Sequence, residues 1–187
     1  MLRRLYNWVL GLAGGPYALP ALAAMAFIDG SFFPMPPDFL LGPMVLARRD
    51  RAWLYAGTTT VASILGGAVG YAIGHFLAPF AFKLLGLTGH MAAFRTFYAH
   101  IGLAVILLKG FTPIPYQLVS IASGMAAFSF PLFIGASLLT RGMRFFIEAT
   151  VLQHPAAQAF IDKHLTVLFI AGIAAIIAIL VIVERLH

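Results

Sequence analysis

The sequence has no cysteine and few charged residues. Without cysteine the chain cannot form disulfides or thiolate metal sites. Charged residues make up 10% of its 187 residues, whereas soluble domains contain about 25%. Only six residues are Asp or Glu, which argues against a carboxylate metal centre. The chain also lacks Gly-x-Ser-x-Gly, His-Glu-x-x-His and a Gly-rich phosphate loop before Lys-Ser/Thr, so we expect no enzyme and no cofactor.

Hydrophobic residues are correspondingly abundant, at 61%, with a mean hydropathy of +0.96. A compact chain of this size cannot hide so much apolar surface from water. We therefore expect an integral membrane protein. The net charge of +6 comes from twelve Lys and Arg against six Asp and Glu. So few charges do not make a nucleic-acid surface, but they fit anionic headgroups and the positive bias of cytoplasmic loops.

Two stretches predict plain spanning helices, which need about 20 apolar residues. Leu165–Val183 is almost purely aliphatic, and Ala52–Phe76 is the second span. Gly66, Gly70 and Gly74 recur at four-residue spacing within it, a pattern that lets another helix approach closely. We interpret this glycine stripe as a packing feature.

Two proline-rich segments interrupt the remaining apolar sequence. Their breaks are Pro34-Met35-Pro36-Pro37 and Pro113-Ile114-Pro115. Pro-x-Pro ends a helix, and a broken backbone in lipid is tolerated only where protein or a water-filled cavity covers it. We therefore expect two re-entrant hairpins, over Ala18–Ala47 and Ile101–Leu139. Similar interruptions in the two halves of a chain are typical of transporters.

Arginine positions predict the topology. Arg3 and Arg4 precede the first hairpin, and three further arginines at 48, 49 and 51 follow it, so both its ends should be cytoplasmic. The 52–76 helix then crosses outward, the second hairpin dips in from the outer face, and the 165–183 helix returns. Residues 78–100 and 145–162 are expected to be interfacial. The fold class is a single all-α membrane domain over residues 1–187.

This topology leaves one question open. It places Arg141 and Arg144 on the outer side, against the charge rule. Either the topology is wrong there, since Gln117–Leu139 is itself long enough to span, or these arginines are buried and paired for a functional reason.

Four stretches of the sequence resemble those of a known family and occur in the same order along the chain. They are Ile28–Asp38, Gly70–Gly74, Lys109–Tyr116 running on to Gly124, and Arg141–Phe145. This set resembles the DedA family (the SNARE-associated or VTT superfamily), in particular its short branch with a Phe-Phe-Pro-x-Pro-Pro-acid segment. The resemblance implies opposed re-entrant hairpins and movement of lipids: undecaprenyl phosphate in some bacterial members and phospholipids in eukaryotic relatives. For some bacterial members it also implies a role in proton-dependent membrane homeostasis.

The resemblance assigns roles to particular residues. Asp29 and Asp38 occupy the places of two acids at the first hairpin, and Lys109 occupies that of a basic residue opening the second. Other branches carry a further arginine where this chain has Pro115-Tyr116. A polyprenyl phosphate site would therefore lack one cationic contact here.

The residues themselves also indicate a polar site. A charge at the bilayer centre costs about 2.5–3.5 kcal/mol, so Asp29, Asp38 and Lys109 should face a cavity or pair with one another. In the functional interpretation Lys109 attracts an anion and the aspartates take protons. In the structural interpretation they form an ion pair, or Asp38 caps the helix after Pro37.

Arg141 and Arg144 lie three residues apart, on one helical face. Their guanidinium groups suit a lipid phosphate, and Glu148, one turn beyond Arg144, could orient it or take part in proton coupling. The alternative is an ordinary anchor to anionic headgroups. Gln117 is a weaker candidate for lining the pocket. The candidate hairpin-break residues are Pro34, Pro36, Pro37, Pro113, Pro115 and Gly124.

These features favour a bacterial inner-membrane protein that flips or scrambles an anionic lipid such as a polyprenyl phosphate or a phospholipid. The alternatives are a proton- or ion-coupled transporter of a small solute and a non-transporting membrane scaffold. The expected partners are membrane lipids and protons, with no nucleic acid and no metal. Whether the protein forms a homo-oligomer stays an open question.

Overall fold

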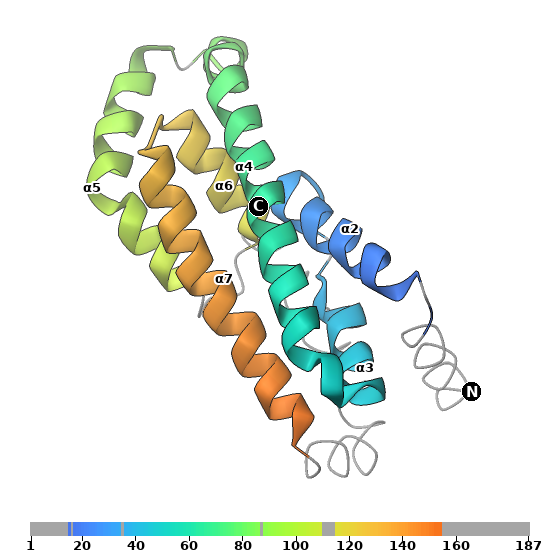
Figure 1. The fold of residues 1–187 in the computed structure, drawn as a ribbon. Coiled ribbons are helices and arrows are strands. Elements are labelled where there is room, and N and C mark those ends of the chain that lie inside the picture. The colour runs from blue at the N-terminus through green and yellow to red at the C-terminus, as the bar shows by residue number, and fades with distance from the viewer. Residues whose placement is uncertain (1–14, 16, 35, 87, 110–114, 155–187) are drawn as a thin grey trace, which may run out of the picture.

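The computed structural model describes residues 15, 17–34, 36–86, 88–109 and 115–154, with the backbone alone at Lys109. Every regular element in this part of the chain is a helix, as Figure 1 shows. The elements are α2 (Ala18–Ser31), α3 (Asp38–Ala47), the 3-10 turn η1 (Arg49–Arg51), α4 (Ala52–Leu84), the 3-10 turn η2 (Thr88–His90), α5 (Met91–Lys109), α6 (Tyr116–Met125) and α7 (Phe130–Gln153).

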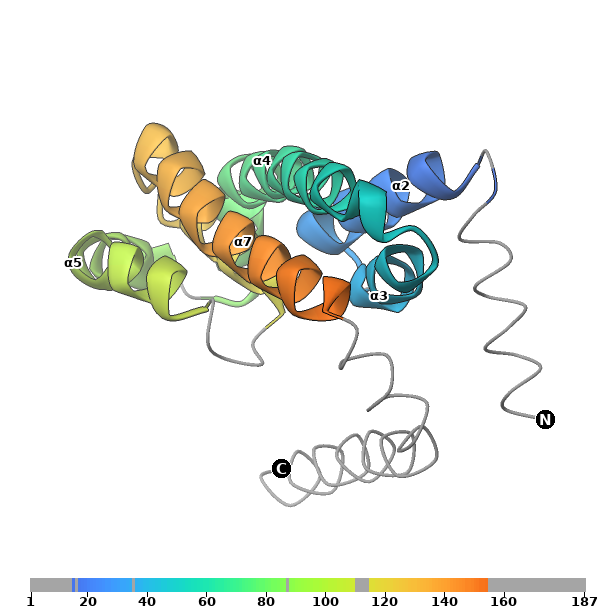
Figure 2. The same cartoon turned by 60° about the horizontal axis from the view of Figure 1, so that its bottom comes forward.

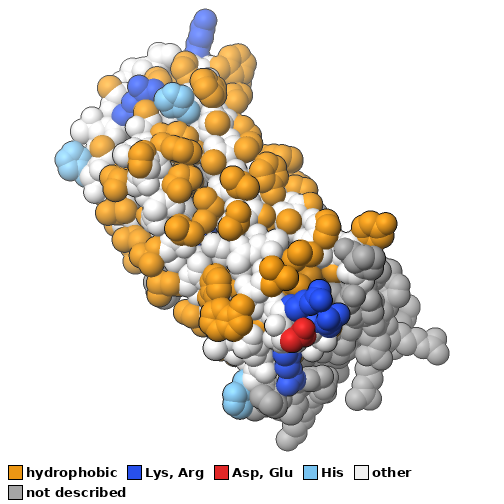
Figure 3. Space-filling model, viewed as in Figure 1, with side chains coloured by type: hydrophobic (Ala, Val, Ile, Leu, Met, Phe, Trp, Pro, Cys, Tyr) orange, Lys and Arg blue, Asp and Glu red, His pale blue; other side chains and the backbone are white. Residues whose placement is uncertain are grey.

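Three of these helical stretches are long and apolar enough to cross a membrane. They are Arg49–Leu84, Thr88–Leu108 and Phe130–Gln153. Large apolar side chains in their middles face outward, among them Val61, Leu65 and Leu138, each more than half exposed. On the face in Figure 3, hydrophobic side chains cover the middle, and Lys and Arg gather toward the two ends. The expectation of an all-helical fold is confirmed for the described residues, and the three apolar helices are compatible with an integral membrane protein.

Helix α4 is the axis on which α2, α6 and α7 pack, and its glycines explain how. A Cβ atom added at Gly66 would lie 2.0 Å from the Phe27 carbonyl oxygen of α2. One added at Gly74 would lie 2.0 Å from the Ile121 carbonyl oxygen of α6. No side chain larger than hydrogen fits at these contacts, so the glycine stripe is a packing feature, as predicted.

The helix pairs α2–α3 and α5–α6 approach each other near the middle of α4. Helix α2 approaches this level from one end of the bundle and ends with Gly30 against Gly67. Helix α6 begins at the same level, with the Tyr116 ring against Gly67, and runs toward the opposite end. Figures 1 and 2 show α3 lying beside the N-terminal half of α4, while α5 and α6 lie toward its C-terminal end.

The proline predictions have mixed outcomes. Pro34, Pro36 and Pro37 separate α2 from α3, so the first break is confirmed. Pro115 immediately precedes α6, whereas Pro113 lies outside the described residues. Gly124 is not part of the second break. It lies near the end of α6, where an added Cβ would meet the Tyr71 carbonyl oxygen at 1.9 Å.

Helix α4 extends beyond the expected end at Phe76. It continues to Leu84 with the exposed Pro79 inside it. The stretch 78–100, expected to be one interfacial segment, is therefore divided between α4 and α5.

The helices over 101–139, the predicted second hairpin, have other bounds than expected. Helix α5 already begins at Met91, and α6 ends at Met125. Ala127 then adopts a left-handed conformation, with φ 53°, and a new helix starts at Phe130. The Tyr71 hydroxyl donates a hydrogen bond to the Phe128 carbonyl and fixes this turn. Residues 117–139 are therefore not one continuous span.

The C-terminal predictions are only partly within the described residues. Residues 145–153, expected to be interfacial, continue α7 without interruption. The predicted span Leu165–Val183 and the rest of the 145–162 segment lie outside the described residues, apart from His154.

Candidate functional site

One ion pair lies in the interior, where the two helix pairs meet. Asp29, in the last turn of α2, accepts a hydrogen bond from Arg141 in the middle of α7. Their side chains are only 11% and 4% exposed, respectively. The Arg141 guanidinium also lies over the Tyr116 ring, 4.2 Å from its centre, and 5.2 Å from the centre of the Phe145 ring. Buried charges need such pairing, so this pair closes α2 and α6 against α7.

A second ion pair lies one helical turn further along α7. Arg144 Nη2 is 2.5 Å from Asp38 Oδ2, and these side chains are 37% and 31% exposed. Asp38 is the first residue of α3 and makes no capping hydrogen bond; Pro37 holds the N-cap position. The cap interpretation of Asp38 is therefore wrong. Its carboxylate still lies favourably at the positive end of the helix dipole.

Glu148 joins this second pair. It lies one turn beyond Arg144 and is close enough to interact electrostatically with both Arg144 and Asp38. Within the described part of the chain, Asp38 Oδ1 is buried and accepts no hydrogen bond. Asp38, Arg144 and Glu148, here called the outer cluster, thus place two carboxyl groups beside one guanidinium.

A pocket of about 410 Å³ opens beside the outer cluster, between α5 and α7. Its described lining residues are Leu107, Leu139, Thr140, Met143, Arg144, Ile147 and Glu148. Four of these side chains are apolar, and the charged groups all belong to the outer cluster. The pocket therefore suits an amphipathic molecule with an apolar chain and an anionic group that can reach Arg144.

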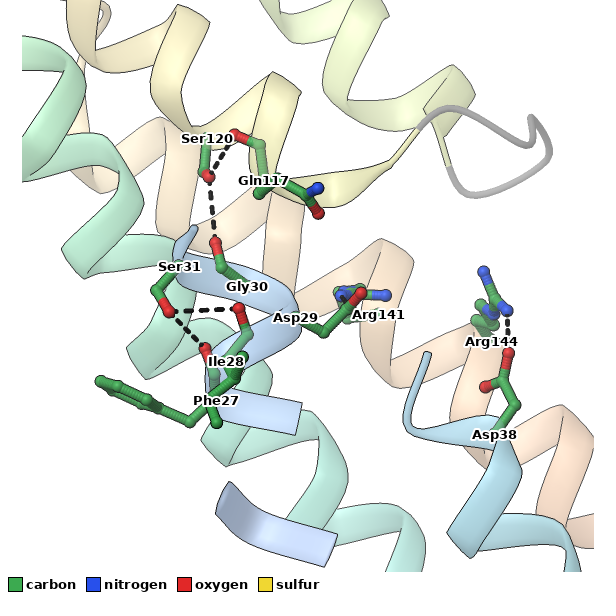
Figure 4. A network of polar contacts seen from close by, with 10 residues as sticks. All are labelled: Phe27, Ile28, Asp29, Gly30, Ser31, Asp38, Gln117, Ser120, Arg141 and Arg144. Atoms are coloured by element: carbon green, nitrogen blue, oxygen red, sulfur yellow. Dashed lines mark hydrogen bonds and ion pairs between the residues drawn. The ribbon is translucent and has the colours of Figure 1, made fainter. Parts of the chain in front are cut away.

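The buried face of α6 adds uncharged polar groups beside the inner pair. Ser120 Oγ lies 3.1 Å from the Gly30 carbonyl oxygen and 2.9 Å from that of Gln117, so its hydroxyl links α6 to the end of α2 (Figure 4). In the described structure, Gln117 Oε1 and Arg141 Nε are buried without a hydrogen-bond partner. Where α2, α6 and α7 meet, a hydrogen-bond acceptor and a donor are thus left without a partner among the described side chains.

The structure brings together most of the candidate residues, but in pairs that the sequence did not indicate. The aspartates were expected to pair with each other or with Lys109, and each instead pairs with an arginine of α7 (Figure 4). Lys109 ends α5, and its side chain lies outside the described structure. Of the two explanations for Arg141 and Arg144, the second is met in part, because both arginines are paired and Arg141 is buried.

Two contributors were missed by sequence reasoning. Tyr116 supplies the ring under Arg141, and Ser120 supplies the link to α2. The signal for Ser120 was its place in the run Gln117, Ser120 and Ser123, which lines one face of an otherwise apolar helix. Among the described residues there is no group of three His, Cys, Asp or Glu that could hold a metal ion.

Comparison with known proteins gives two bacterial relatives. A protein of Haemophilus influenzae, named only "Uncharacterized protein", is 32% identical over 136 residues, which is 71% of each chain. The "Uncharacterized protein HI0703 homolog" of Histophilus somni is 30% identical over 180 residues, covering 95% of this chain and 94% of the relative. No family model and no solved structure matches the chain. The similarity to the two relatives extends over most of the length of each, and the chain belongs to the bacterial protein family that they represent.

Proposed function

We propose that this protein moves an anionic lipid between the leaflets of the bacterial inner membrane. The observation that carries the proposal is the pocket between α5 and α7, which joins an apolar lining to the partly exposed Arg144. A phospholipid or polyprenyl phosphate has this same combination of an apolar chain and a charged phosphate.

Arg144 has hydrogen-bonding capacity for such a headgroup. A guanidinium presents five N–H donors, and the Arg144 side chain is 37% exposed while one of its nitrogens contacts Asp38. A phosphate could therefore bind beside Asp38 or replace it. Arg141 is less suited to this role, because its side chain is only 4% exposed and lies against two aromatic rings.

The helix arrangement supports a path for the headgroup. The end of α2 and the start of α6 both lie at the middle of α4, and these helices extend from there toward opposite ends of the bundle. We infer that the α2–α3 and α5–α6 pairs are the two re-entrant hairpins. Charged and polar side chains gather at this level, whereas the outer surface is apolar. Such an arrangement lets a headgroup cross beside protein while its chains remain in lipid. The resemblance to the DedA family points to the same class of function.

Reconstitution into liposomes tests the proposal. Fluorescent phosphatidylglycerol and phosphatidylcholine would be followed in parallel, with a membrane-impermeant quencher reporting the lipid that reaches the outer leaflet. We expect the protein to accelerate movement of phosphatidylglycerol, and to act less on the zwitterionic lipid. If folded protein gives no movement of either lipid above that in empty liposomes, the proposal is wrong.

A transporter of a small polar solute is the second candidate. The observation in its favour is the buried polar capacity at Gln117 Oε1 and Arg141 Nε. This candidate predicts that Gln117→Leu abolishes solute uptake while phosphatidylglycerol movement stays at the level of empty liposomes.

A further inference from the structure

The net charge of the outer cluster indicates what must accompany the binding of an anionic lipid. This inference rests on the proposed function. Asp38 from α3 and Glu148 from α7 face one guanidinium, that of Arg144. Among the described side chains that line the pocket, Arg144 and Glu148 are the charged ones. With both carboxyl groups ionised, the cluster carries one net negative charge, which would repel an anionic headgroup.

The inner pair has no such imbalance. Asp29 and Arg141 are one acid and one base, so their charges cancel. An anion at Arg144 would meet two carboxylates, and these like charges would repel it. A nearby negative charge also makes a carboxylate a better proton acceptor. Protonation of one carboxyl group would offset the charge of the anion and leave the site with the same net charge of −1 that it has without the lipid.

The geometry offers a place for that proton. Asp38 Oδ1 is buried and accepts no hydrogen bond in the described structure. A protonated Glu148 has one O–H donor, and Glu148 lies within interaction distance of Asp38. The proton would be shared between these two carboxyl groups, while Arg144 bonds to the phosphate.

We propose that a lipid phosphate binds Arg144 together with one proton, which is taken up from solvent and held between Glu148 and Asp38. No covalent bond other than the carboxyl O–H forms. Binding of the anionic lipid thereby brings no net charge into the site. The affinity for the lipid therefore falls as pH rises above the range in which the cluster can take up the proton.

Calorimetry on the purified, detergent-solubilised protein tests this inference. The probe is short-chain phosphatidylglycerol, whose phosphodiester keeps one negative charge, whereas a phosphate monoester titrates near pH 6 and would confuse the proton count. Titrations at about pH 8, where ordinary carboxyl groups are ionised, in two buffers of different ionisation enthalpy give the protons taken up per lipid. We expect a value close to one.

Matched variants assign the proton. Glu148→Gln should abolish proton uptake and bind the lipid about three- to tenfold more tightly at this pH, because one like charge is gone. Asp50→Asn removes an acid of the exposed η1 turn and should behave as the unaltered protein. Arg144→Gln should lose binding. Inorganic phosphate and glycerophosphoglycerol, which lack acyl chains, should bind at least tenfold more weakly than the lipid.

The outcomes separate the two proposals. Phosphatidylglycerol binding without proton uptake by the unaltered protein overturns the inference and leaves the proposed function standing. Proton uptake that persists in a folded Glu148→Gln variant also overturns the inference. Absence of phosphatidylglycerol binding by folded protein contradicts the proposed function and the inference together.

Discussion

Two ion pairs of the same residue types lie one helical turn apart on α7, yet their surroundings differ. Arg141 and Asp29 are almost fully buried, and two aromatic rings lie against the arginine. Arg144 and Asp38 are about one third exposed, and Arg144 lines a pocket. Separation of a buried pair leaves charges that water cannot reach, whereas a partly exposed pair can exchange partners. The inner pair therefore suits a structural role and the outer pair a binding role.

The largest expected effect is the loss of one member of the inner pair. Asp29→Asn should lower the free energy of unfolding by about 3–5 kcal/mol, because Arg141 is left charged and buried without its acid. Thermal unfolding in detergent, followed by tryptophan fluorescence, measures this loss.

A double variant provides the control. Asp29→Asn combined with Arg141→Gln removes both charges and should recover much of the stability. If the single variant is as stable as the unaltered protein, the inner pair does not have the structural role given to it here.

A smaller loss is expected where the backbones that position Asp29 approach most closely. Gly66→Ala places a methyl group 2.0 Å from the Phe27 carbonyl oxygen, two residues before Asp29. The forced separation of α2 from α4 should cost about 1–3 kcal/mol of stability. Gly57→Ala in the same helix is the matched control, since nothing lies within 4 Å of its added Cβ. Equal stability of the two variants would mean that this contact does not hold α2 in place.

The outer pair should contribute little to stability. Asp38→Asn is expected to cost about 0–1 kcal/mol, because water and lipid headgroups can reach Arg144. The same unfolding experiment measures this change beside that of Asp29→Asn. A loss as large as that of the inner pair would remove the distinction between them.

The smallest effect sets the baseline for the comparison. Asp50 pairs with Arg48 and Arg51 at the surface, at 3.7 Å and 3.8 Å, and its side chain is 65% exposed. Asp50→Asn should change the free energy of unfolding by less than about 0.5 kcal/mol. A larger loss would show that surface charge pairs stabilise this protein more than expected, and the Asp38 result would then be compared with the new baseline.

Proline and glycine positions in the sequence predicted a helix end and the close contacts between helices. The first proline cluster ends α2 because proline lacks an N–H and restricts the preceding residue. The glycine stripe predicted the close helix contacts, although not which helices make them. Pro79 shows where this reasoning stops, because an exposed proline inside the long helix α4 did not end it.

The pairing of charges could not be predicted from one sequence. Asp29 and Arg141 are 112 residues apart, and their contact depends on how α7 is rotated against α2. The i, i+3 spacing placed Arg141 and Arg144 on one face but gave no indication of what that face contacts. The turn between α6 and α7 has no glycine at its left-handed position, Ala127, so its signal was weak.

The central claim is that Arg144 contacts the phosphate of a moving lipid. Its most direct test is the rate of fluorescent phosphatidylglycerol movement in liposomes that contain equal amounts of folded Arg144→Gln or Asp50→Asn protein. We expect a rate at least about tenfold lower for Arg144→Gln than for Asp50→Asn, consistent with loss of a charge-assisted contact. Equal rates for the two variants, both above the rate in empty liposomes, would contradict it.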